Sequence, residues 1–141
     1  FHHVEELKLV RGFEGEKYLQ IADYVTTVPN TDSKLNINTA SAVLLASLDP
    51  ELEVNAVQQV IQQRQANLQY FSNVSELWAI EPFAQVGNEV RTELNDLLGV
   101  QSNYFKARIE VILSERKRKF SSDLVRKDKT VYVAYRSMAP F

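Results

Sequence analysis

Residues 104–113 read Tyr-Phe-Lys-Ala-Arg-Ile-Glu-Val-Ile-Leu, and this stretch decides the fold class of the C-terminal part of the chain. From Phe105 to Leu113 apolar side chains occupy every second position, which is the period of a strand with one buried face. The residues that follow alternate between polar turns and strand-like segments: a turn at 115–117, a strand at 118–125, a turn at 127–129 and a Val- and Tyr-rich strand at 130–136. The pattern predicts an antiparallel three-stranded meander.

The residues before this stretch have helical spacing instead. Apolar residues recur at intervals of three and four, which predicts a helical domain over 1–102 followed by strands over 103–141, an α+β fold. Asn38 or Thr39 is expected to cap the third helix, Asn73 or Ser75 is expected to cap the fifth, and the turn cluster at 29–33 predicts a linker. The predicted helices cover 4–12, 16–25, 40–48, 54–67, 73–80 and 86–98.

Charge is divided unevenly between these two parts. The whole chain has 16 Lys and Arg against 18 Asp and Glu, a net charge of −2. Residues 103–141 contain 10 basic and 4 acidic residues, a net of +6, so residues 1–102 carry a net of −8. The asymmetry supports two lobes of different surface character.

Several classes of function lack the residues that they need. The chain has no cysteine, which excludes disulfide bonds, a thiol nucleophile and thiolate metal ligands. His2 and His3 are the only histidines, and no nucleophile elbow, phosphate-binding loop or dinucleotide fingerprint is present. No apolar run approaches the roughly 20 residues that span a bilayer, and no signal peptide is visible. We therefore expect a protein that is not an enzyme.

One pattern of an aromatic, an acidic and several aliphatic residues occurs twice, at a 70-residue offset. In each copy the aromatic residue precedes a predicted helix. We expect it to pack against the apolar face of that helix, as a hydrophobic staple does. The first copy is Phe1, Val4, Glu6, Leu7 and Val10, followed by Gly12; the second is Phe71, Val74, Glu76, Leu77 and Ile80.

Charged residues of the strand region suggest two binding sites. Asp123, Asp128 and Glu110 offer oxygen ligands for calcium, but no loop has the acid density of an EF-hand, and solvated charges are the preferred interpretation. The basic run 116–119 has the composition of a patch for nucleic acid or an anionic membrane. Because alternation in a strand would divide its side chains between two faces, we prefer a solvated hairpin tip.

The segment from Leu35 to Ser41, with the helical residues after it, resembles the helix-hairpin-helix unit of competence-type DNA-receptor proteins. That family presents bare backbone N–H groups to phosphate from a Gly-x-Gly turn. Here the turn at 49–53 is Asp-Pro-Glu-Leu-Glu, with no glycine, no N–H at Pro50 and three carboxylates. Coulomb repulsion opposes phosphate binding there, so we expect no nucleic acid partner. A periplasmic DNA-binding protein of this type remains the alternative function.

Two degenerate helix-hairpin-helix units followed by a meander resemble the type II secretion system protein K family, the large minor pseudopilins. The resemblance covers essentially the whole chain. It rests on both copies of the repeat and on two polar motifs: Asn36, Ile37, Asn38, Thr39 and Ala40 after Leu35, and Ser102, Asn103, Tyr104 and Phe105. The family implies SAM-like helical repeats at about 1–28 and 34–80, inserted into a pilin-type sheet to which 103–141 belong.

The resemblance also implies that the sequence is a fragment, lacking the long N-terminal helix and the first part of the sheet. A meander this small cannot cover both of its faces. The helical lobe, a missing segment or a partner must then cover the apolar residues of the strands. These residues are Phe105, Ile109, Val111, Leu124, Val131 and Val133.

The family further implies a non-enzymatic role at the tip of the periplasmic pseudopilus. There the protein would join minor pseudopilins I and J, then H and the rest of the filament, initiate assembly and cap the filament during protein export. It would be a periplasmic domain anchored in the inner membrane only through the missing helix. The secretin or a secreted substrate are further expected partners, and calcium is a cofactor that the family suggests without identifiable ligands here.

Overall fold

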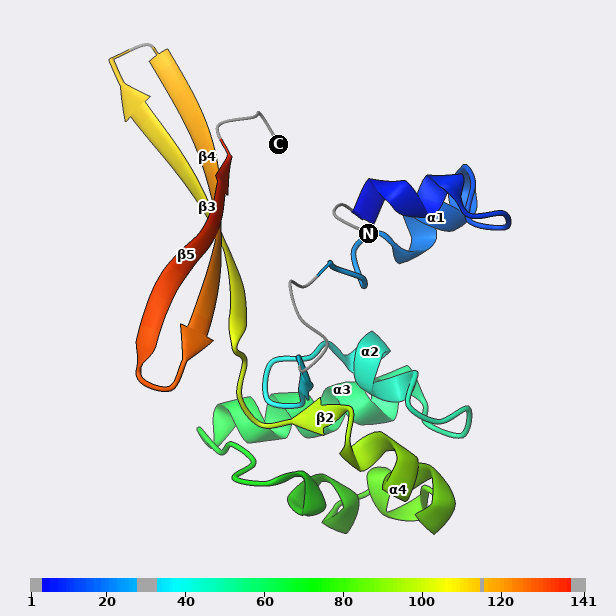
Figure 1. Ribbon diagram of the computed structural model, residues 1–141. Coiled ribbons are helices and arrows are strands. Elements are labelled where there is room, and N and C mark those ends of the chain that lie inside the picture. Colours follow the sequence, from blue (N-terminus) through cyan, green and yellow to red (C-terminus); the bar gives the residue numbers. More distant parts are fainter. Residues whose placement is uncertain (1–3, 28–32, 115, 138–141) are drawn as a thin grey trace. The chain divides into compact units, whose positions relative to one another are not determined.

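The computed structural model describes residues 4–27, 33–114 and 116–137. By its internal contacts the chain divides into two units, residues 1–32 and residues 33–141 (Figure 1). Phe1 of the first repeat copy and residues 29–32 of the expected linker lie outside the described residues. The division expected at residue 102 is a different one and stays a prediction.

The first unit contains two short helical segments joined by a glycine turn. A 3-10 helix, η1, spans Val4–Leu9, and α1 spans Glu16–Ile21, shorter than predicted. Gly12 in the turn has a φ of 98°, a conformation that favours glycine. Among the described residues of this unit only Tyr18 is buried, with the Lys8 ammonium 4.5 Å from its ring centre. This unit therefore has little core of its own.

The second unit begins with a helical part closed by a pair of short strands. Its elements are β1 (Leu35–Asn36), α2 (Ala42–Ala46), α3 (Val54–Ala66), η2 (Val74–Ala79), η3 (Phe83–Gln85), α4 (Asn88–Asn95) and β2 (Leu98–Gly99). β1 and β2 pair in parallel, Leu35 opposite Leu98 and Asn36 opposite Gly99. The helix predicted at 86–98 is therefore wrong at both ends. Local periodicity missed β2 because its partner strand lies far away in the sequence.

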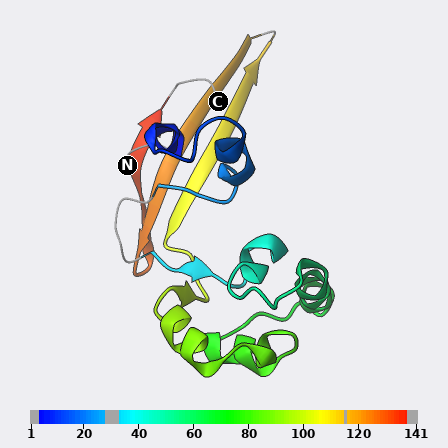
Figure 2. The same ribbon diagram turned by 90° about the vertical axis from the view of Figure 1, so that its right-hand side faces the viewer.

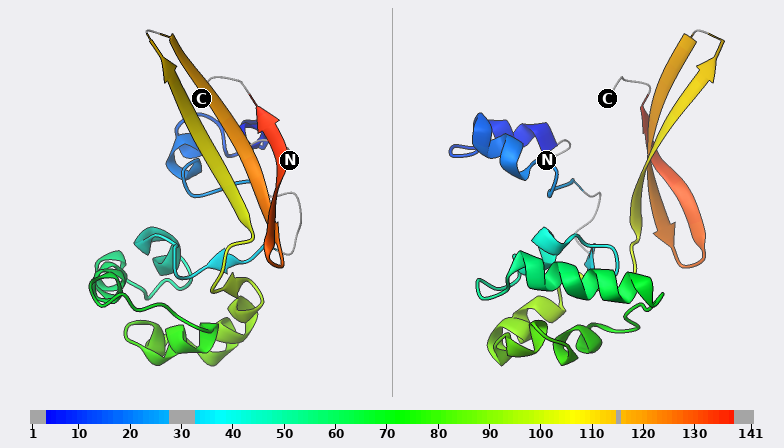
Figure 3. Two further views of the ribbon diagram at one scale, coloured as in Figure 1. Left: turned by 90° about the vertical axis from the view of Figure 1, so that its left-hand side faces the viewer. Right: turned by 180° about the vertical axis from the view of Figure 1, so that it is seen from behind.

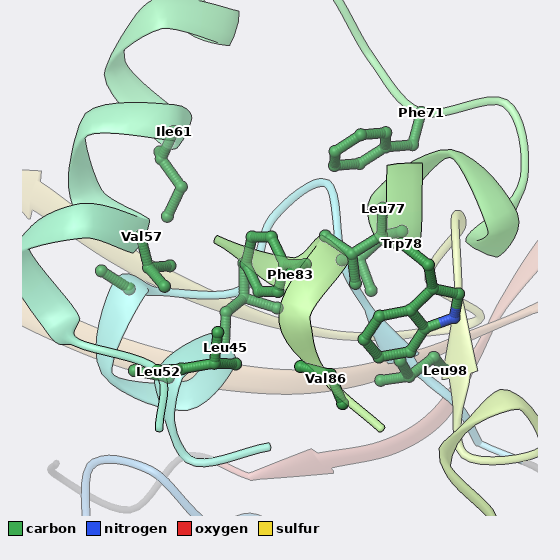
Figure 4. Close-up of a cluster of buried hydrophobic side chains, with 13 residues drawn as sticks. Leu45, Leu52, Val57, Ile61, Phe71, Leu77, Trp78, Phe83, Val86 and Leu98 are labelled. Atoms are coloured by element: carbon green, nitrogen blue, oxygen red, sulfur yellow. The ribbon is translucent and has the colours of Figure 1, made fainter. Parts of the chain in front are cut away.

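A cluster of apolar side chains forms the core of this helical part. Phe83 lies near its centre, with Val57 of α3 on one side and Leu77 and Trp78 of η2 on the other (Figure 4). Burying one such side chain stabilises the fold by about 1.5–3 kcal/mol. The buried members are Ile37, Ala42, Leu45, Ala46, Leu52, Val57, Ile61, Phe71, Leu77, Trp78, Phe83, Val86 and Leu98.

Two helices, α2 and η2, have an N-terminal residue whose side chain caps the first turn. Ser41 caps α2, its Oγ accepting a hydrogen bond from the Leu44 N–H at 3.4 Å, so the predicted cap at Asn38 or Thr39 is wrong. Asn38 was a plausible cap by residue type, but its side chain bonds to other segments. At η2 the predicted cap is confirmed, since the Asn73 Oδ1 accepts from the Glu76 N–H at 3.2 Å.

The antiparallel meander is confirmed, as is the α+β fold. Strands β3 (Tyr104–Leu113), β4 (Arg116–Lys127) and β5 (Thr130–Ser137) pair in the order β3-β4-β5. In the described part of the chain β5 pairs with Ser121–Lys127, and the β3–β4 hairpin continues past it as a two-stranded ribbon (Figures 2 and 3). The turn predicted at 115–117 is too long, because Arg116 and Lys117 already pair with β3.

One face of this three-stranded sheet is largely apolar, although it also carries Ser122, Arg126 and Arg136. In the observed register six residues share it, two of them on β5, and we call them the apolar sheet face: Phe105, Ile109, Val111, Leu124, Val131 and Val133. Phe105 is 40% exposed, Ile109 47% and Val133 45%. The described residues thus leave this face largely uncovered, as the size of the meander predicts.

Candidate functional site

Asn38 is the centre of a polar junction between three segments of the helical part. Its Nδ2 donates to the carbonyl oxygens of Phe71 at 3.0 Å and Val100 at 3.1 Å. Its Oδ1 accepts from the Phe71 N–H at 2.8 Å. Both amide protons and the amide oxygen are therefore used, and an asparagine is the natural residue for this position.

Asn36 extends the junction to the residues after β2. Its Nδ2 donates to the Ser102 Oγ at 2.9 Å, and its Oδ1 accepts from the Asn38 N–H at 3.0 Å. Ile37 between the two asparagines is fully buried, while Ala40 packs against the core and Thr39 is exposed. The structure thus brings the first polar motif of the sequence against the start of the second.

The second polar motif leads from the helical part into β3. The Asn103 carbonyl accepts from the Arg126 N–H at 2.8 Å, and the Arg126 Nη2 donates to the side-chain oxygens of Gln101 at 2.9 Å and Asn103 at 3.2 Å. Arg126 of β4 therefore holds the segment by which the chain enters the sheet. Phe105, the last residue of the motif, lies on the apolar sheet face.

Arg64 of α3 lies against this junction and was not identified from the sequence. Its guanidinium carbon is 4.2 Å from the ring centre of Phe71, and its Nη2 donates to the Asn38 carbonyl at 3.5 Å. The residue is 9% exposed and its Nε has no hydrogen-bond partner. Burial lowers the pKa of Arg64, with an opposing contribution from Tyr70. Its position on the same helix face as Val57 and Ile61 was the available signal, because a cation there must be buried.

A second polar cluster joins β3 to β4 on the face opposite the apolar one. Tyr104 donates a hydrogen bond to Asp123, and the Lys106 Nζ lies 3.8 Å from the Asp123 Oδ1. Burial, followed by the hydrogen bond to Asp123 and its negative charge, raises the pKa of Tyr104 to about 12. The cluster holds the neutral tyrosine at the beginning of β3.

The two copies of the repeat have different surroundings. In the second copy Phe71 and Leu77 are buried, and Val74 and Ile80 pack against the core. Glu76 reaches back to accept hydrogen bonds from the Ser72 N–H and the Asn73 Nδ2. In the first copy Val4, Glu6, Leu7 and Val10 are half-buried and Gly12 is exposed. The equivalence of the two copies stays a prediction.

The turn between α2 and α3 uses its own backbone donors. The Asp49 Oδ1 accepts from the Glu51 N–H at 2.9 Å, and the Asp49 carbonyl accepts from the Leu52 N–H at 3.1 Å. Pro50 has no N–H to offer. Two backbone N–H groups of the turn are thus engaged within it and do not face phosphate, which the acidic side chains at 49, 51 and 53 also repel.

The carboxylates considered for calcium do not gather in one place. Asp123 faces Lys106, Glu110 lies 3.9 Å from the Lys117 Nζ, and Asp128 occupies the β4–β5 turn with a φ of 56°. Within the described ranges no group of three or more His, Cys, Asp or Glu side chains is placed to hold a metal ion. No helix in the described part of the chain is long and apolar enough to cross a membrane.

Residues 35–101 match the family model of type II secretion system (T2SS), protein K. Over these 67 of its 141 residues the chain matches the type II secretion system protein K family. The matched range contains β1, the whole helical core and the Asn38 junction, so the junction is part of what this family model describes. Protein K is a minor pseudopilin, a structural component of the secretion machinery. A search of curated protein sequences found no match.

A solved structure shares the fold of this chain. It is a chain in the crystal structure of the GspK-GspI-GspJ complex from the enterotoxigenic Escherichia coli type 2 secretion system, with a TM-score of 0.73 and 22% sequence identity. The match covers 100% of the present chain and 49% of the crystallised chain, so the present chain spans about half its length. At this identity the likeness shows the fold, including the small antiparallel sheet beside the helical part.

Proposed function

We propose that this chain works at the tip of the periplasmic pseudopilus, where it joins minor pseudopilins I and J, initiates assembly and caps the filament. The match to the protein K family supports a pseudopilin role. The similar fold found in a GspK-GspI-GspJ complex supports I and J as partners. Minor pseudopilin H, the filament, the secretin and a secreted substrate would be reached through this tip complex, in the periplasm beside the inner membrane.

The observation that carries this proposal is the exposure of the apolar sheet face. β3 and β5 expose Phe105, Ile109 and Val133 by 40–47%, and Val131 by 52%. A contiguous apolar patch of this kind marks a surface that is covered in an assembly. Association at such a patch removes apolar area from water, so it tolerates salt.

The helical part suits a capping role because it completes its own core and presents a polar exterior. The exposed side of α3 carries Gln58, Gln59, Gln62 and Gln63, next to the acidic turn at 49–53. A polar surface does not recruit a further pilin-like subunit by apolar packing. In this proposal the helical domain predicted over 1–102 caps the filament. The sheet lobe predicted over 103–141 binds the other minor pseudopilins.

Titration of the labelled chain with the purified soluble pair of minor pseudopilins I and J, at low and high salt, tests the proposal. We expect micromolar or tighter affinity that changes little with salt. Val131→Thr with Val133→Thr should weaken binding by about tenfold, because two apolar groups of the interface become polar. Tyr132→Thr is the matched control, since Tyr132 lies between them on the opposite face.

Two results would contradict the proposal. One is the absence of binding to the I and J pair by a chain that is folded by circular dichroism. The other is binding to double-stranded DNA that weakens steeply with salt, as the competence-type alternative predicts. The N–H groups of Glu51 and Leu52 in the turn at 49–53 are already occupied, which speaks against that alternative.

A further inference from the structure

The β3–β4 hairpin extends beyond the third strand of its sheet. Its outermost pairs are Glu110–Lys119, Val111–Arg118, Ile112–Lys117 and Leu113–Arg116, while the described part of β5 pairs no further than Ser121. We call these eight residues the hairpin arm. A two-stranded ribbon without a third strand or a packed face is only marginally stable in water. The arm therefore has the properties of a segment that another surface completes.

Composition divides the hairpin arm into an aliphatic strand and a cationic strand. Ile112 is 59% exposed, Leu113 76% and Val111 45%. Opposite them β4 carries four consecutive cations, Arg116 to Lys119, all exposed. Glu110 is the single acid among the eight, and it lies 3.9 Å from the Lys117 Nζ. The eight residues thus combine exposed aliphatic side chains with a net charge of +3, and the whole stretch 110–119, which includes Glu115, has a net charge of +2.

The faces of the hairpin arm show what kind of surface fits it. Strand alternation places Leu113 and Arg116 on one face, and Ile112 and Lys117 on the other. Both faces therefore carry an aliphatic side chain beside a cation. A protein partner docked on one face would leave the other exposed. A bilayer surrounds an inserted tip on all sides and satisfies both faces at once.

We propose that the hairpin arm binds the surface of an anionic phospholipid bilayer. Ile112 and Leu113 enter the boundary between headgroups and acyl chains, and the cations of β4 lie at the lipid phosphates. Long basic side chains can bury their stems and keep their charge at the interface. Each basic residue near an anionic leaflet adds attraction that fades within a Debye length. Cations on a sheet edge also oppose aggregation, but that role requires no exposed aliphatic tip.

Cosedimentation of the full chain with vesicles tests the charge requirement. We expect binding to phosphatidylcholine vesicles that contain phosphatidylglycerol, and none to phosphatidylcholine alone. Arg116→Gln with Arg118→Gln should weaken binding by about tenfold or more. Lys127→Gln with Lys129→Gln is the matched control, because it removes the same charge at the exposed β4–β5 turn, the other end of the sheet. Equal losses in both variants would mean attraction by net charge alone and would overturn the proposal.

Insertion of the tip of the hairpin arm into the bilayer needs a separate measurement. Because the chain has no cysteine, a single introduced cysteine can be labelled specifically. Leu113→Cys and Lys129→Cys are each labelled with a polarity-sensitive fluorophore. With anionic vesicles the emission at position 113 should shift to the blue, and that at position 129 should not. No shift at 113, or the same shift at both positions, contradicts the proposal. A double-stranded DNA duplex that binds the arm while anionic vesicles do not would assign the cations to nucleic acid instead.

The lipid proposal and the tip-subunit proposal can fail independently. Val131→Thr with Val133→Thr should leave vesicle binding unchanged, because neither residue belongs to the hairpin arm. Conversely, Arg116→Gln with Arg118→Gln should leave the affinity for minor pseudopilins I and J unchanged. An arm variant that loses both activities while its circular dichroism and thermal midpoint stay normal would show that one surface serves both, and would overturn the separate lipid role.

Discussion

The side-chain amide of Asn38 pairs with the backbone of Phe71 as one strand pairs with another. The Nδ2 donates to the Phe71 carbonyl at 3.0 Å, and the Oδ1 accepts from the Phe71 N–H at 2.8 Å. The two residues are 33 positions apart. An irregular backbone segment next to the core thereby has its polar groups satisfied by one side chain, as buried backbone requires.

Asn38→Asp should destabilise the helical part by about 2–4 kcal/mol. The carboxylate would face the carbonyl oxygens of Phe71 and Val100, which now receive protons from the Nδ2. Urea unfolding followed by Trp78 fluorescence measures the change. Asn55→Asp, the same substitution on the exposed first turn of α3, should change stability by less than about 0.5 kcal/mol. Equal effects would remove the special role of Asn38.

Phe71→Ala should cost about 3–5 kcal/mol, because a buried aromatic ring is replaced by a cavity. Phe71 is 8% exposed and belongs to the core cluster. Tyr70→Ala provides the neighbouring control, since Tyr70 is 69% exposed and its truncation should cost less than about 1 kcal/mol. A small effect of Phe71→Ala in the same unfolding experiment would mean that the ring makes no important packing contacts.

Arg64→Met should leave the free energy of unfolding within about 1 kcal/mol of the parent, whereas Arg64→Ala should lower it by about 2 kcal/mol. The guanidinium lies over the Phe71 ring, but this buried group has an unsatisfied Nε. Methionine keeps the packing and removes the desolvated charge. Gln62→Met on the exposed side of α3 is the control. A severe loss for Arg64→Met would show that the charge itself stabilises the junction.

Ser41→Ala should lower stability by about 1 kcal/mol, the usual cost of losing a helix cap. Its Oγ accepts from the Leu44 N–H, whereas the exposed Thr39 Oγ1 donates at 3.5 Å to the Asn36 carbonyl. Thr39→Ala should therefore cost less than about 0.5 kcal/mol. If chemical unfolding showed a larger loss for Thr39→Ala than for Ser41→Ala, Thr39 would be the cap, as the sequence predicted.

Stability should fall as the pH rises from about 10 to about 12, in part because of Tyr104. Its pKa is raised to about 12 in the folded chain from an ordinary value of 10.0. The folded state then holds a proton that the unfolded state releases, so the stabilisation is complete below pH 10 and is lost as the pH approaches 12. Tyr104→Phe should remove this loss of stability. In a pH titration followed by tyrosinate absorbance, it should also remove the latest phase, the step at the highest pH. Tyr132→Phe, on the same face, should leave that latest phase in place.

Patterns that are local in the sequence predicted most of the elements. Alternation over 104–113 and 130–136 was sufficient for the meander, because the strands follow one another and pair with their neighbours. Helical spacing likewise located α3, and residue type located the cap at Asn73. The motif from Asn36 to Ala40 was identified by family resemblance, but its bonds were not, since their partners are far along the chain.

The sequence by itself determined the α+β fold, the absence of cysteine chemistry, the acidic turn without glycine and the resemblance to protein K. Each depends on residue types and on spacings within about one element. Tertiary structure alone decided the parallel pairing of β1 with β2, the position of Phe83 in the core and the burial of Arg64. It also decided that the cations 116–119 extend a strand opposite exposed aliphatic residues instead of forming a turn. The physical reason is that pairing register and burial arise from contacts between residues distant in the chain, which local periodicity does not contain.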